Sequence, residues 1–362
     1  MSIKRICFVV YDIEVLGGAE QVAVNLANKL CESYLVQIYS ICGNERNSLY
    51  RINSKIHIEF ANNQNSRIRQ LIFENTRKFN KYLKKNHIDI AFLIGAYSAG
   101  ITAPSQLVTK TRFVFCDHGA LMNQWKEKDI TTLRWIASKI SNRTVVLTDK
   151  TRADYIEKFN IKPTRILRIY NWIDSDLMKN SCDYNIDSKR IITVGRISKE
   201  KGFDLLVRVA EKVLPKYPEW CWEILGDGED FEKIRKLVEK KGLQNQVILK
   251  GCVQNASQYF SQYSFYVLPS YREGLPLVLL EAKVNKLPII SFDIETGPRE
   301  IISKENGILI EPYDCEAMAQ AISKLIEDAN LRKKMSDRSG DNLAEFEMNI
   351  ILKQWISIIE EL

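Results

Sequence analysis

The chain has 362 residues, of which 45% are hydrophobic and 27% are charged, a composition typical of a globular protein. A single core is rare at this length, so we expect two domains of roughly 170 to 190 residues each. No apolar run approaches the roughly 18 residues that span a bilayer, and the first apolar stretch is too short for a secretory signal. Eight scattered cysteines without a CxxC pair argue against a zinc site or a disulfide framework and favour a reducing cytosol.

The net charge of +7 is unevenly distributed along the chain. Residues 1–170 contain 26 Lys and Arg against 14 Asp and Glu, whereas residues 171–362 contain 26 against 31. The first half therefore has a net charge of +12 and the second half of −5. This asymmetry predicts that the first half meets an anionic partner, and nucleic acid, an acidic membrane surface and a lipid diphosphate all fit.

Short β-rich runs alternate with longer amphipathic stretches through the first half. Strands are predicted at residues 5–11, 35–41, 56–60, 88–94, 112–116, 144–147 and 165–169. Helical periodicity falls between them, most clearly at residues 20–31, 68–85 and 131–141. Almost entirely apolar strands that alternate with helices predict a parallel sheet covered on both faces.

The second half repeats this scheme. Its predicted strands are residues 190–194, 222–225, 247–250, 266–268, 289–291 and 308–310. Periodicity is lost near residues 170–189, where polar turn formers gather. The predicted fold class is therefore α/β, with two doubly wound, Rossmann-like domains at residues 1–170 and 171–362. The last helix either stays with the second domain or packs on the first. Because ligands of such sheets lie beyond the carboxyl ends of the strands, we expect the site in a cleft between two facing domains.

Two motifs of the first half follow predicted strands. Gly17 and Gly18 open a helix, where small residues let the backbone approach a ligand and the helix start favours an anion. A glycine loop that serves only the strand-to-helix turn is the alternative. His118 ends a strand before a glycine, and its neutral imidazole could hydrogen-bond a sugar or support charge development. A histidine satisfied by packing is the alternative there.

Basic residues follow the first strand of the second half. Arg196 ends the VGR run and Lys201 follows within a KG pair, which places a guanidinium and an ammonium at the carboxyl edge of the sheet. Together they could neutralise a diphosphate without a metal ion, unless they are solvated surface cations. The next strand ends in a GDG turn, to which we assign a structural role, with Asp227 predicted to cap a helix that begins near Glu229.

The run EGLPLVLLEA, residues 273–282, is the most informative segment of the chain. It places the carboxylates of Glu273 and Glu281 eight positions apart, on either side of a helix start. Gly274 and Leu275 add free backbone N–H groups and the partial positive charge of that helix start. Acceptors for hydroxyl groups beside donors for a phosphate make a site suited to a sugar nucleotide.

Two further segments have weaker functional interpretations. Asp174-Ser175-Asp176 has the form of a DxD metal clamp, but it lies in the interdomain segment, and no other group has metal-ligand spacing. We therefore predict no metal ion and no cofactor. Residues 66–85 form an amphipathic helix with seven cations against the single Glu74. Its basic face is either merely solvated or in contact with anionic lipid headgroups, and the two are not exclusive.

Together these motifs resemble the retaining GT-B glycosyltransferases of glycosyltransferase family 4, and the resemblance covers nearly the whole chain. The ETGPREII run from Glu295 is similar to members that build bacterial surface polysaccharides. The resemblance implies a hexose or N-acetylhexosamine donor linked to a nucleoside diphosphate, most often UDP, a lipid-linked or growing saccharide acceptor, and a cytoplasmic protein that sits peripherally at the inner membrane face. The YNWID run replaces the PNG-type turn that is more usual in this family. What the family implies about acceptor binding therefore carries over to this chain less directly.

The resemblance also implies the role of each site residue. Arg196 and Lys201 would hold the diphosphate, Glu281 the ribose hydroxyls, and Glu273 the hydroxyls of the donor sugar. Gly17, Gly18, Gly274 and Leu275 would lie along the donor, and His118 would contact its sugar near the anomeric carbon. A nucleotide-sugar epimerase or hydrolase is the alternative enzyme. Nucleic-acid binding is disfavoured, because no recognition module or stacking platform accompanies the basic residues.

Overall fold

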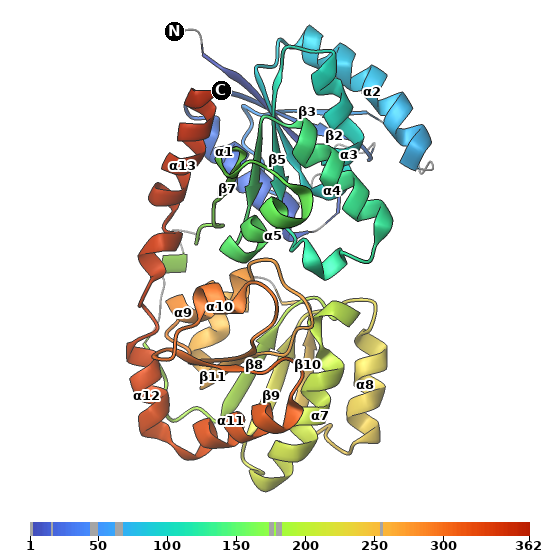
Figure 1. Cartoon of the computed structure of the whole chain (residues 1–362). Coiled ribbons are helices and arrows are strands. Elements are labelled where there is room, and N and C mark those ends of the chain that lie inside the picture. The colour runs from blue at the N-terminus through green and yellow to red at the C-terminus, as the bar shows by residue number, and fades with distance from the viewer. Residues whose placement is uncertain are drawn as a thin grey trace. The chain divides into compact units, whose positions relative to one another are not determined.

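A computed structural model describes residues 3–15, 17–43, 50–61, 68–173, 177–178, 183–253 and 256–362. The chain divides into two compact units, Met1–Tyr170 with Leu352–Leu362, and Asn171–Ile351. The helix α13 (Met348–Glu361) begins in the second unit and ends in the first (Figure 1).

The first unit contains a parallel sheet in the order β3-β2-β1-β4-β5-β6-β7. Its strands are β1 (Arg5–Val10), β2 (Leu35–Ser40), β3 (His57–Phe60), β4 (Ile90–Ile94), β5 (Arg112–Asp117), β6 (Arg143–Val146) and β7 (Ile166–Arg168). Its helices are α1 (Gly18–Leu30), α2 (Ile68–Lys85), α3 (Gly95–Thr102), α4 (Lys128–Ile140) and α5 (Asp149–Phe159), with the 3-10 turns η1 (Ala103–Leu107), η2 (Met122–Gln124) and η3 (Pro163–Arg165). The strand order reverses between β1 and β4.

Alternate residues of the central strand β1 enter two different cores. Cys7 and Val9 belong to the cluster that includes residues of α2, α3 and α4. Phe8, on the opposite face, stacks on Phe92 of β4 with ring centroids 5.2 Å apart. Trp355 of α13 meets the edge of Phe92 at 5.5 Å. The C-terminal helix thus covers part of the first sheet.

The second unit contains a parallel sheet in the order β10-β9-β8-β11-β12-β13. Its strands are β8 (Arg190–Val194), β9 (Cys221–Leu225), β10 (Val247–Gly251), β11 (Phe265–Leu268), β12 (Ile289–Phe292) and β13 (Gly307–Ile310). Its helices are α7 (Phe203–Val213), α8 (Phe231–Lys240), α9 (Leu277–Val284), α10 (Pro298–Ile301), α11 (Cys315–Glu327) and α12 (Ala329–Asp337), with the 3-10 turns η4 (Lys199–Lys201), η5 (Leu214–Lys216), η6 (Ala256–Gln262) and η7 (Leu343–Phe346).

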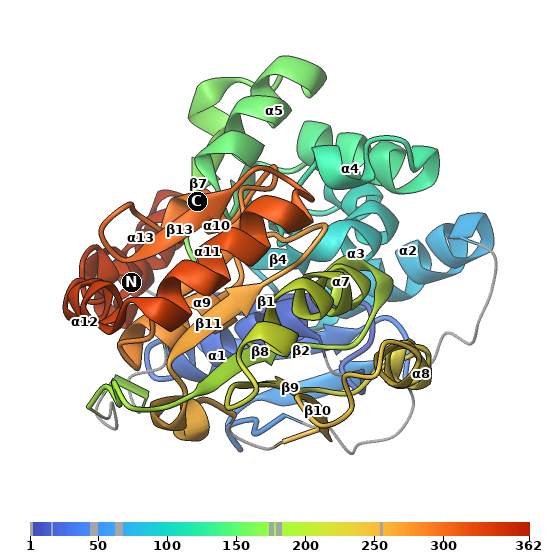
Figure 2. The ribbon, with the colours of Figure 1, turned by 90° about the horizontal axis from the view of Figure 1, so that it is seen from below.

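One face of α7 shows why this helix forms where it does. Phe203, Leu206, Val207 and Ala210 recur at helical spacing and are all buried in one cluster, which also includes residues of α8 and α11. Figure 2 shows α7 and α11 beside one another on that face of the second sheet.

The fold class predicted from the sequence is confirmed. Every predicted strand is present, and its ends lie within two residues of those expected. Both sheets are parallel throughout and have helices on both faces, as doubly wound domains do. The expected cleft between the domains stays a prediction. In the described part of the chain, no helix is long and apolar enough to cross a bilayer.

A buried charged cluster joins β5 to the helices α4 and α5. Asp117, only 2% exposed, ends β5 and lies 2.9 Å from Nε of the buried Arg134. Tyr155 donates a 2.6 Å hydrogen bond to the same carboxylate, and the backbone N–H of Gly119 donates to its other oxygen at 3.1 Å. The cluster therefore fixes the turn that follows β5.

We expect Arg134→Met to destabilise the protein by about 3 kcal/mol, because it leaves the buried Asp117 carboxylate without its cation. Arg77→Met, at an exposed position of α2, is the control and should change the free energy of unfolding by less than about 0.5 kcal/mol. Denaturant unfolding followed by circular dichroism measures both. Equal stability of the two variants would contradict the role of Asp117 as a buried, charge-paired group.

Candidate functional site

The carboxyl edge of the second sheet carries a tightly held carboxylate. Lys201, at the end of η4, donates from Nζ to both oxygens of Glu273 at 2.8 Å. Ser270 donates its hydroxyl to Oε1 of the same group at 2.7 Å. Glu273 is 8% exposed, so its charge needs these partners. The structure thus joins two residues that lie far apart in the sequence.

Tyr266 of β11 is hydrogen-bonded to the end of β8. Its hydroxyl donates to the carbonyl of Val194 at 2.9 Å and accepts from the N–H of the same residue at 3.1 Å. Burial raises the pKa of Tyr266, and the nearby carboxylates of Glu273 and Glu281 raise it further. The Tyr266 hydroxyl thus holds Val194, which lies two residues before Arg196.

Arg196 lies at the same edge but has a different partner. Its side chain is 66% exposed, and Nε donates to Glu229 at 3.1 Å. An exposed ion pair of this kind contributes only about 0 to 1 kcal/mol, so an anionic ligand could readily draw the guanidinium away. Nothing joins Arg196 directly to Lys201 or Glu273 in the described contacts.

Glycines shape the two basic loops. Gly202 has φ +66°, and a Cβ there would collide with the carbonyl of Pro269, which leads to Ser270. Gly226 has φ +153°, and its Cβ would collide with the carbonyl of Gly195. The GDG turn therefore has the structural role predicted for it, and the structure adds that it packs against the loop of Arg196. The predicted helix cap is wrong: Asp227 accepts from Gly228 at 2.7 Å, and α8 begins later, at Phe231, with Asp230 as its N-cap.

The loop before α9 is held by the ETGPREII segment. Thr296 donates its hydroxyl to the backbone carbonyl of Glu273 at 2.7 Å. Leu275 is buried and Gly274 partly exposed, and α9 starts at Leu277 without a side-chain cap. Its N-cap, Pro276, has no side-chain acceptor, so the cap itself does not compete with an anion for this helix start.

The first unit places His118 and the two glycines at its own carboxyl edge. His118 follows β5, and its buried Nδ1 has no hydrogen-bond partner among the described residues. Burial lowers the pKa of His118 to about 4, and Asp117 opposes this shift. Gly17 is the N-cap of α1, which begins at Gly18. Tyr50 holds this loop, because its hydroxyl accepts from the N–H of Gly17 at 2.7 Å and donates to the carbonyl of Val15 at 2.8 Å.

Sequence reasoning missed the supporting hydroxyl groups of Tyr266, Ser270, Thr296 and Tyr50. A tyrosine inside an apolar strand has the pattern of a core residue, and only the pairing of β11 with β8 shows that its hydroxyl reaches Val194. Only Ser270 could have been found from the sequence, because it lies three residues before Glu273 and therefore close to it along the chain.

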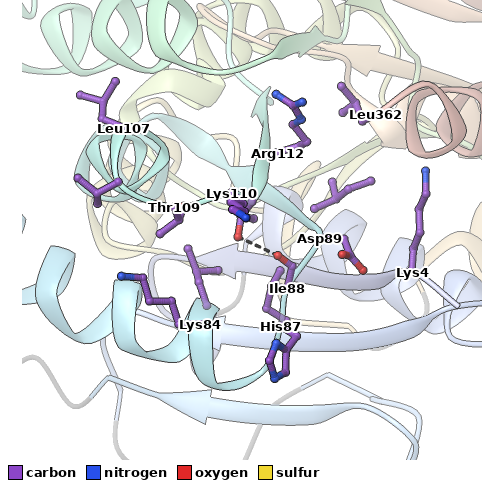
Figure 3. A pocket seen from close by; sticks show the side chains of 14 residues that line it. Lys4, Lys84, His87, Ile88, Asp89, Leu107, Thr109, Lys110, Arg112 and Leu362 are labelled. Atoms are coloured by element: carbon purple, nitrogen blue, oxygen red, sulfur yellow. Dashed lines mark hydrogen bonds between the residues drawn. The ribbon is translucent and has the colours of Figure 1, made fainter. Parts of the chain in front are cut away.

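A cavity of about 1120 Å³ lies elsewhere, at the amino edge of the first sheet. Figure 3 shows Lys84, Lys110 and Arg112 among its lining residues. It contains none of the predicted site residues, so it is not the candidate site. Within the described ranges, no group of three or more His, Cys, Asp and Glu is placed to hold a metal ion. The DxD-like residues 174–176 lie outside those ranges.

Two family models match the chain in succession. Residues 16–177 match the model described as Glycosyltransferase Family 4, and residues 176–340 match the model described as Glycosyl transferases group 1. With the two parallel sheets and their carboxyl-edge residues, these matches define a glycosyltransferase of the GT-B class. The chain belongs to the family 4 type of these enzymes.

Individual proteins are similar over the full length. An uncharacterized glycosyltransferase of Haemophilus influenzae is 29% identical over 98% of this chain and 100% of its own length. The amylovoran biosynthesis glycosyltransferase AmsD of Erwinia amylovora is 27% identical over 95% of this chain and 96% of its own. The crystal structure of Anabaena Alr3699/HepE in complex with UDP-glucose has a TM-score of 0.81 at 16% identity, and the match covers 99% of this chain and 100% of that one.

We expect the buried His118 to make stability fall as the pH is lowered. In the unfolded chain this imidazole gains a proton near pH 6.5, whereas in the folded chain it stays neutral to about pH 4. Between these values the unfolded state binds more protons and is favoured. Between pH 7 and pH 5, the free energy of unfolding of the unaltered protein should fall by about 1 to 2 kcal/mol more than that of His118→Gln.

Thermal or denaturant unfolding across this pH range measures the difference. His57→Gln, at an exposed histidine of the first unit, is the matched control and should change the pH profile less than His118→Gln does. A His118→Gln profile parallel to that of the unaltered protein would show that the imidazole is not held neutral.

Proposed function

We propose that this glycosyltransferase is retaining and metal-independent, and that it transfers a hexose or N-acetylhexosamine from a UDP-sugar to a lipid-linked or growing saccharide. The product would be a bacterial surface polysaccharide. The observation that carries the proposal is the contact of Lys201 with the buried carboxylate of Glu273, near Glu281, at the carboxyl edge of the second sheet. The UDP-glucose bound by the Anabaena protein and the biosynthetic role in the name of AmsD support the donor and the pathway.

The second unit would bind the donor. In this proposal Lys201 and Arg196 neutralise the diphosphate, and the uncapped backbone N–H groups around Gly274 and Leu275 assist them. Glu281 accepts hydrogen bonds from the ribose hydroxyls, and Glu273 accepts them from the donor sugar. Lys201 then has two tasks, since the ammonium that faces the phosphate also holds Glu273 in place.

The first unit would complete the chemistry. Cleavage of the sugar–phosphate bond spreads positive charge over the ring and negative charge onto the diphosphate. A neutral imidazole at His118 can hydrogen-bond the sugar near the anomeric carbon without adding a like charge to the developing cation. Gly17 and Gly18 would lie under the phosphates at the start of α1.

Retention is proposed to follow front-face attack. A carboxylate nucleophile would need a partner acid about 5 Å away, whereas Glu273 is paired with a lysine. The departing phosphate would instead accept the proton of the acceptor hydroxyl as the new bond forms on the same face. Fixed positive groups at the leaving oxygen contribute several kcal/mol to such a step in a dry site.

Lys201→Ala should lower the transfer rate at least about 100-fold, because it removes the charge at the leaving group and releases Glu273. Arg196→Ala should act in the same direction. Lys199→Ala, an exposed neighbour in η4, is the control and should retain nearly full activity. Rates measured with a panel of UDP-sugars decide this, and near-normal turnover in Lys201→Ala would rule out its proposed role.

The alternative enzyme, a nucleotide-sugar epimerase or hydrolase, makes a different prediction. Such an enzyme converts its donor when no acceptor is present. The relatives described above are named as glycosyltransferases and give no support to it. Donor conversion that proceeds at full rate without acceptor, and is not stimulated by any saccharide, would favour the alternative.

We also propose that the first unit binds anionic membranes through the basic face of α2. Lys81, Lys84 and Lys85 are exposed, and Lys78 reaches back to the carbonyl of Ala61 at 2.9 Å. Lys84 and Lys110 both line the amino-edge cavity (Figure 3). Each cation near such a surface contributes about 1 kcal/mol.

Replacing the four α2 lysines with Gln should release the protein from phosphatidylglycerol vesicles in a sedimentation assay. The matched control removes four exposed lysines of the second unit, at positions 233, 236, 240 and 241, and should stay bound. The idea fails when the unaltered protein does not sediment with these vesicles, or when both variants behave alike.

A further inference from the structure

An exposed aromatic pair lies at the reversal point of the first sheet. Tyr11 directly follows β1, and Tyr97 lies in the first turn of α3, directly after β4. Their ring centroids are 5.9 Å apart with the planes tilted by 50°, and the residues are 38% and 42% exposed. The strand order reverses between β1 and β4, and ligands of doubly wound sheets bind at the carboxyl edge at this point.

Two carboxylates follow Tyr11 in the loop after β1. Asp12 follows Tyr11 directly, and its Oδ1 accepts from the N–H of Glu14 at 3.0 Å. Oxygens of both carboxylates lie 3.0 Å from the point where a Cβ on Gly43, beyond β2, would stand. Oε1 of Glu14 is buried and has no hydrogen-bond partner in the described part of the chain. At least one acceptor at this edge is therefore unused.

The local charge has the opposite sign to that of the first half as a whole. Residues 11–20 contain Asp12, Glu14 and Glu20 and no basic residue, and residues 95–109 contain no charged residue. The cations at Lys84, Lys110 and Arg112 lie at the opposite, amino edge of the sheet. A uronate or a phosphorylated sugar stacked on the two rings would therefore meet repulsion from these carboxylates, and we assign the rings to a different part of the ligand from the donor phosphates proposed for Gly17 and Gly18.

A sugar ring without a charge fits this chemistry. The C–H faces of a pyranose are apolar and stack on exposed aromatic rings, whereas its hydroxyl groups need acceptors at the edge. Tyr11 and Tyr97 supply the rings, and Asp12 and Glu14 supply the acceptors. Burial raises the pKa of Tyr11 to about 12, so this ring carries no charge at neutral pH.

We propose that Tyr11 and Tyr97 form the acceptor subsite of this glycosyltransferase and that the ring bound there is uncharged. The proposal rests on the proposed function, since it identifies the terminal sugar of the acceptor saccharide. Tyr97 stacks on that sugar, and the carboxylates of Asp12 and Glu14 accept its hydroxyl hydrogens and exclude uronic acids and phosphorylated sugars.

Saturation-transfer NMR on the full chain tests this without the true acceptor. The probes are neutral methyl glycosides of glucose, galactose, mannose and N-acetylglucosamine, together with the methyl glycoside of glucuronic acid. At least one neutral probe should receive saturation, and the signal should fall at least fivefold in Tyr97→Ala but persist in Tyr97→Phe, which keeps the ring. Tyr259→Ala, at an equally exposed tyrosine of the second unit, should retain it.

The predicted exclusion of charged sugars is tested separately. The glucuronide should give a signal at least fivefold weaker than the best neutral probe, and the double variant Asp12→Asn, Glu14→Gln should narrow this gap. A missing signal for every neutral probe, an unchanged signal in Tyr97→Ala, or a glucuronide signal equal to the neutral one each overturns the proposal.

A separate measurement distinguishes this failure from failure of the proposed function. UDP-sugars should raise the unfolding midpoint of Tyr97→Ala as much as that of the unaltered protein, because donor binding is assigned to the second unit. No protection of either protein by any nucleotide sugar would count against the proposed function, whereas protection together with unaltered glycoside binding in Tyr97→Ala would count against the acceptor subsite only.

Discussion

The candidate donor site depends on one contact, in which the ammonium of Lys201 meets both oxygens of the buried Glu273. A carboxylate with so little exposure is stable only when it is paired and hydrogen-bonded, and the loop before α9 must therefore present it where a cation can arrive. Lys201 reaches Glu273 because the next residue, Gly202, has a left-handed backbone and passes close to the carbonyl of Pro269, where a side chain would collide. Ser270 then supplies the second partner.

The contact between Lys201 and Glu273 joins two side chains that are proposed to bind different parts of the donor. A charge suited to a diphosphate and a carboxylate suited to sugar hydroxyls are held at a fixed separation before any ligand arrives. Tyr266 extends this order to the end of β8, so the loop of Arg196 begins from a fixed point. Arg196 itself is the adjustable member, since its exposed pair with Glu229 is weak and easily exchanged.

Much of this arrangement could be predicted from the sequence, because parallel strands covered on both faces are almost wholly apolar. Once the strands are placed, Arg196, Lys201 and Glu273 follow as residues of one edge. The partners could not be predicted, since the choice of Glu229 for Arg196 and of Thr296 for the Glu273 carbonyl depends on how separate loops pack. The net charge of the first half predicts an anionic partner, but it does not predict the acidic segment at the reversal point of the first sheet, where Asp12 and Glu14 lie.

The helix α13 has a consequence for how the protein is made. Its residues from Leu352 onward belong to the first unit, and Trp355 covers Phe92 in the middle of the first sheet. These residues are synthesised only after the whole of the second unit. The first unit therefore keeps an apolar face of its sheet partly exposed until the second unit has been synthesised, and the usual order, in which the N-terminal domain is complete before the next one emerges, does not apply to it.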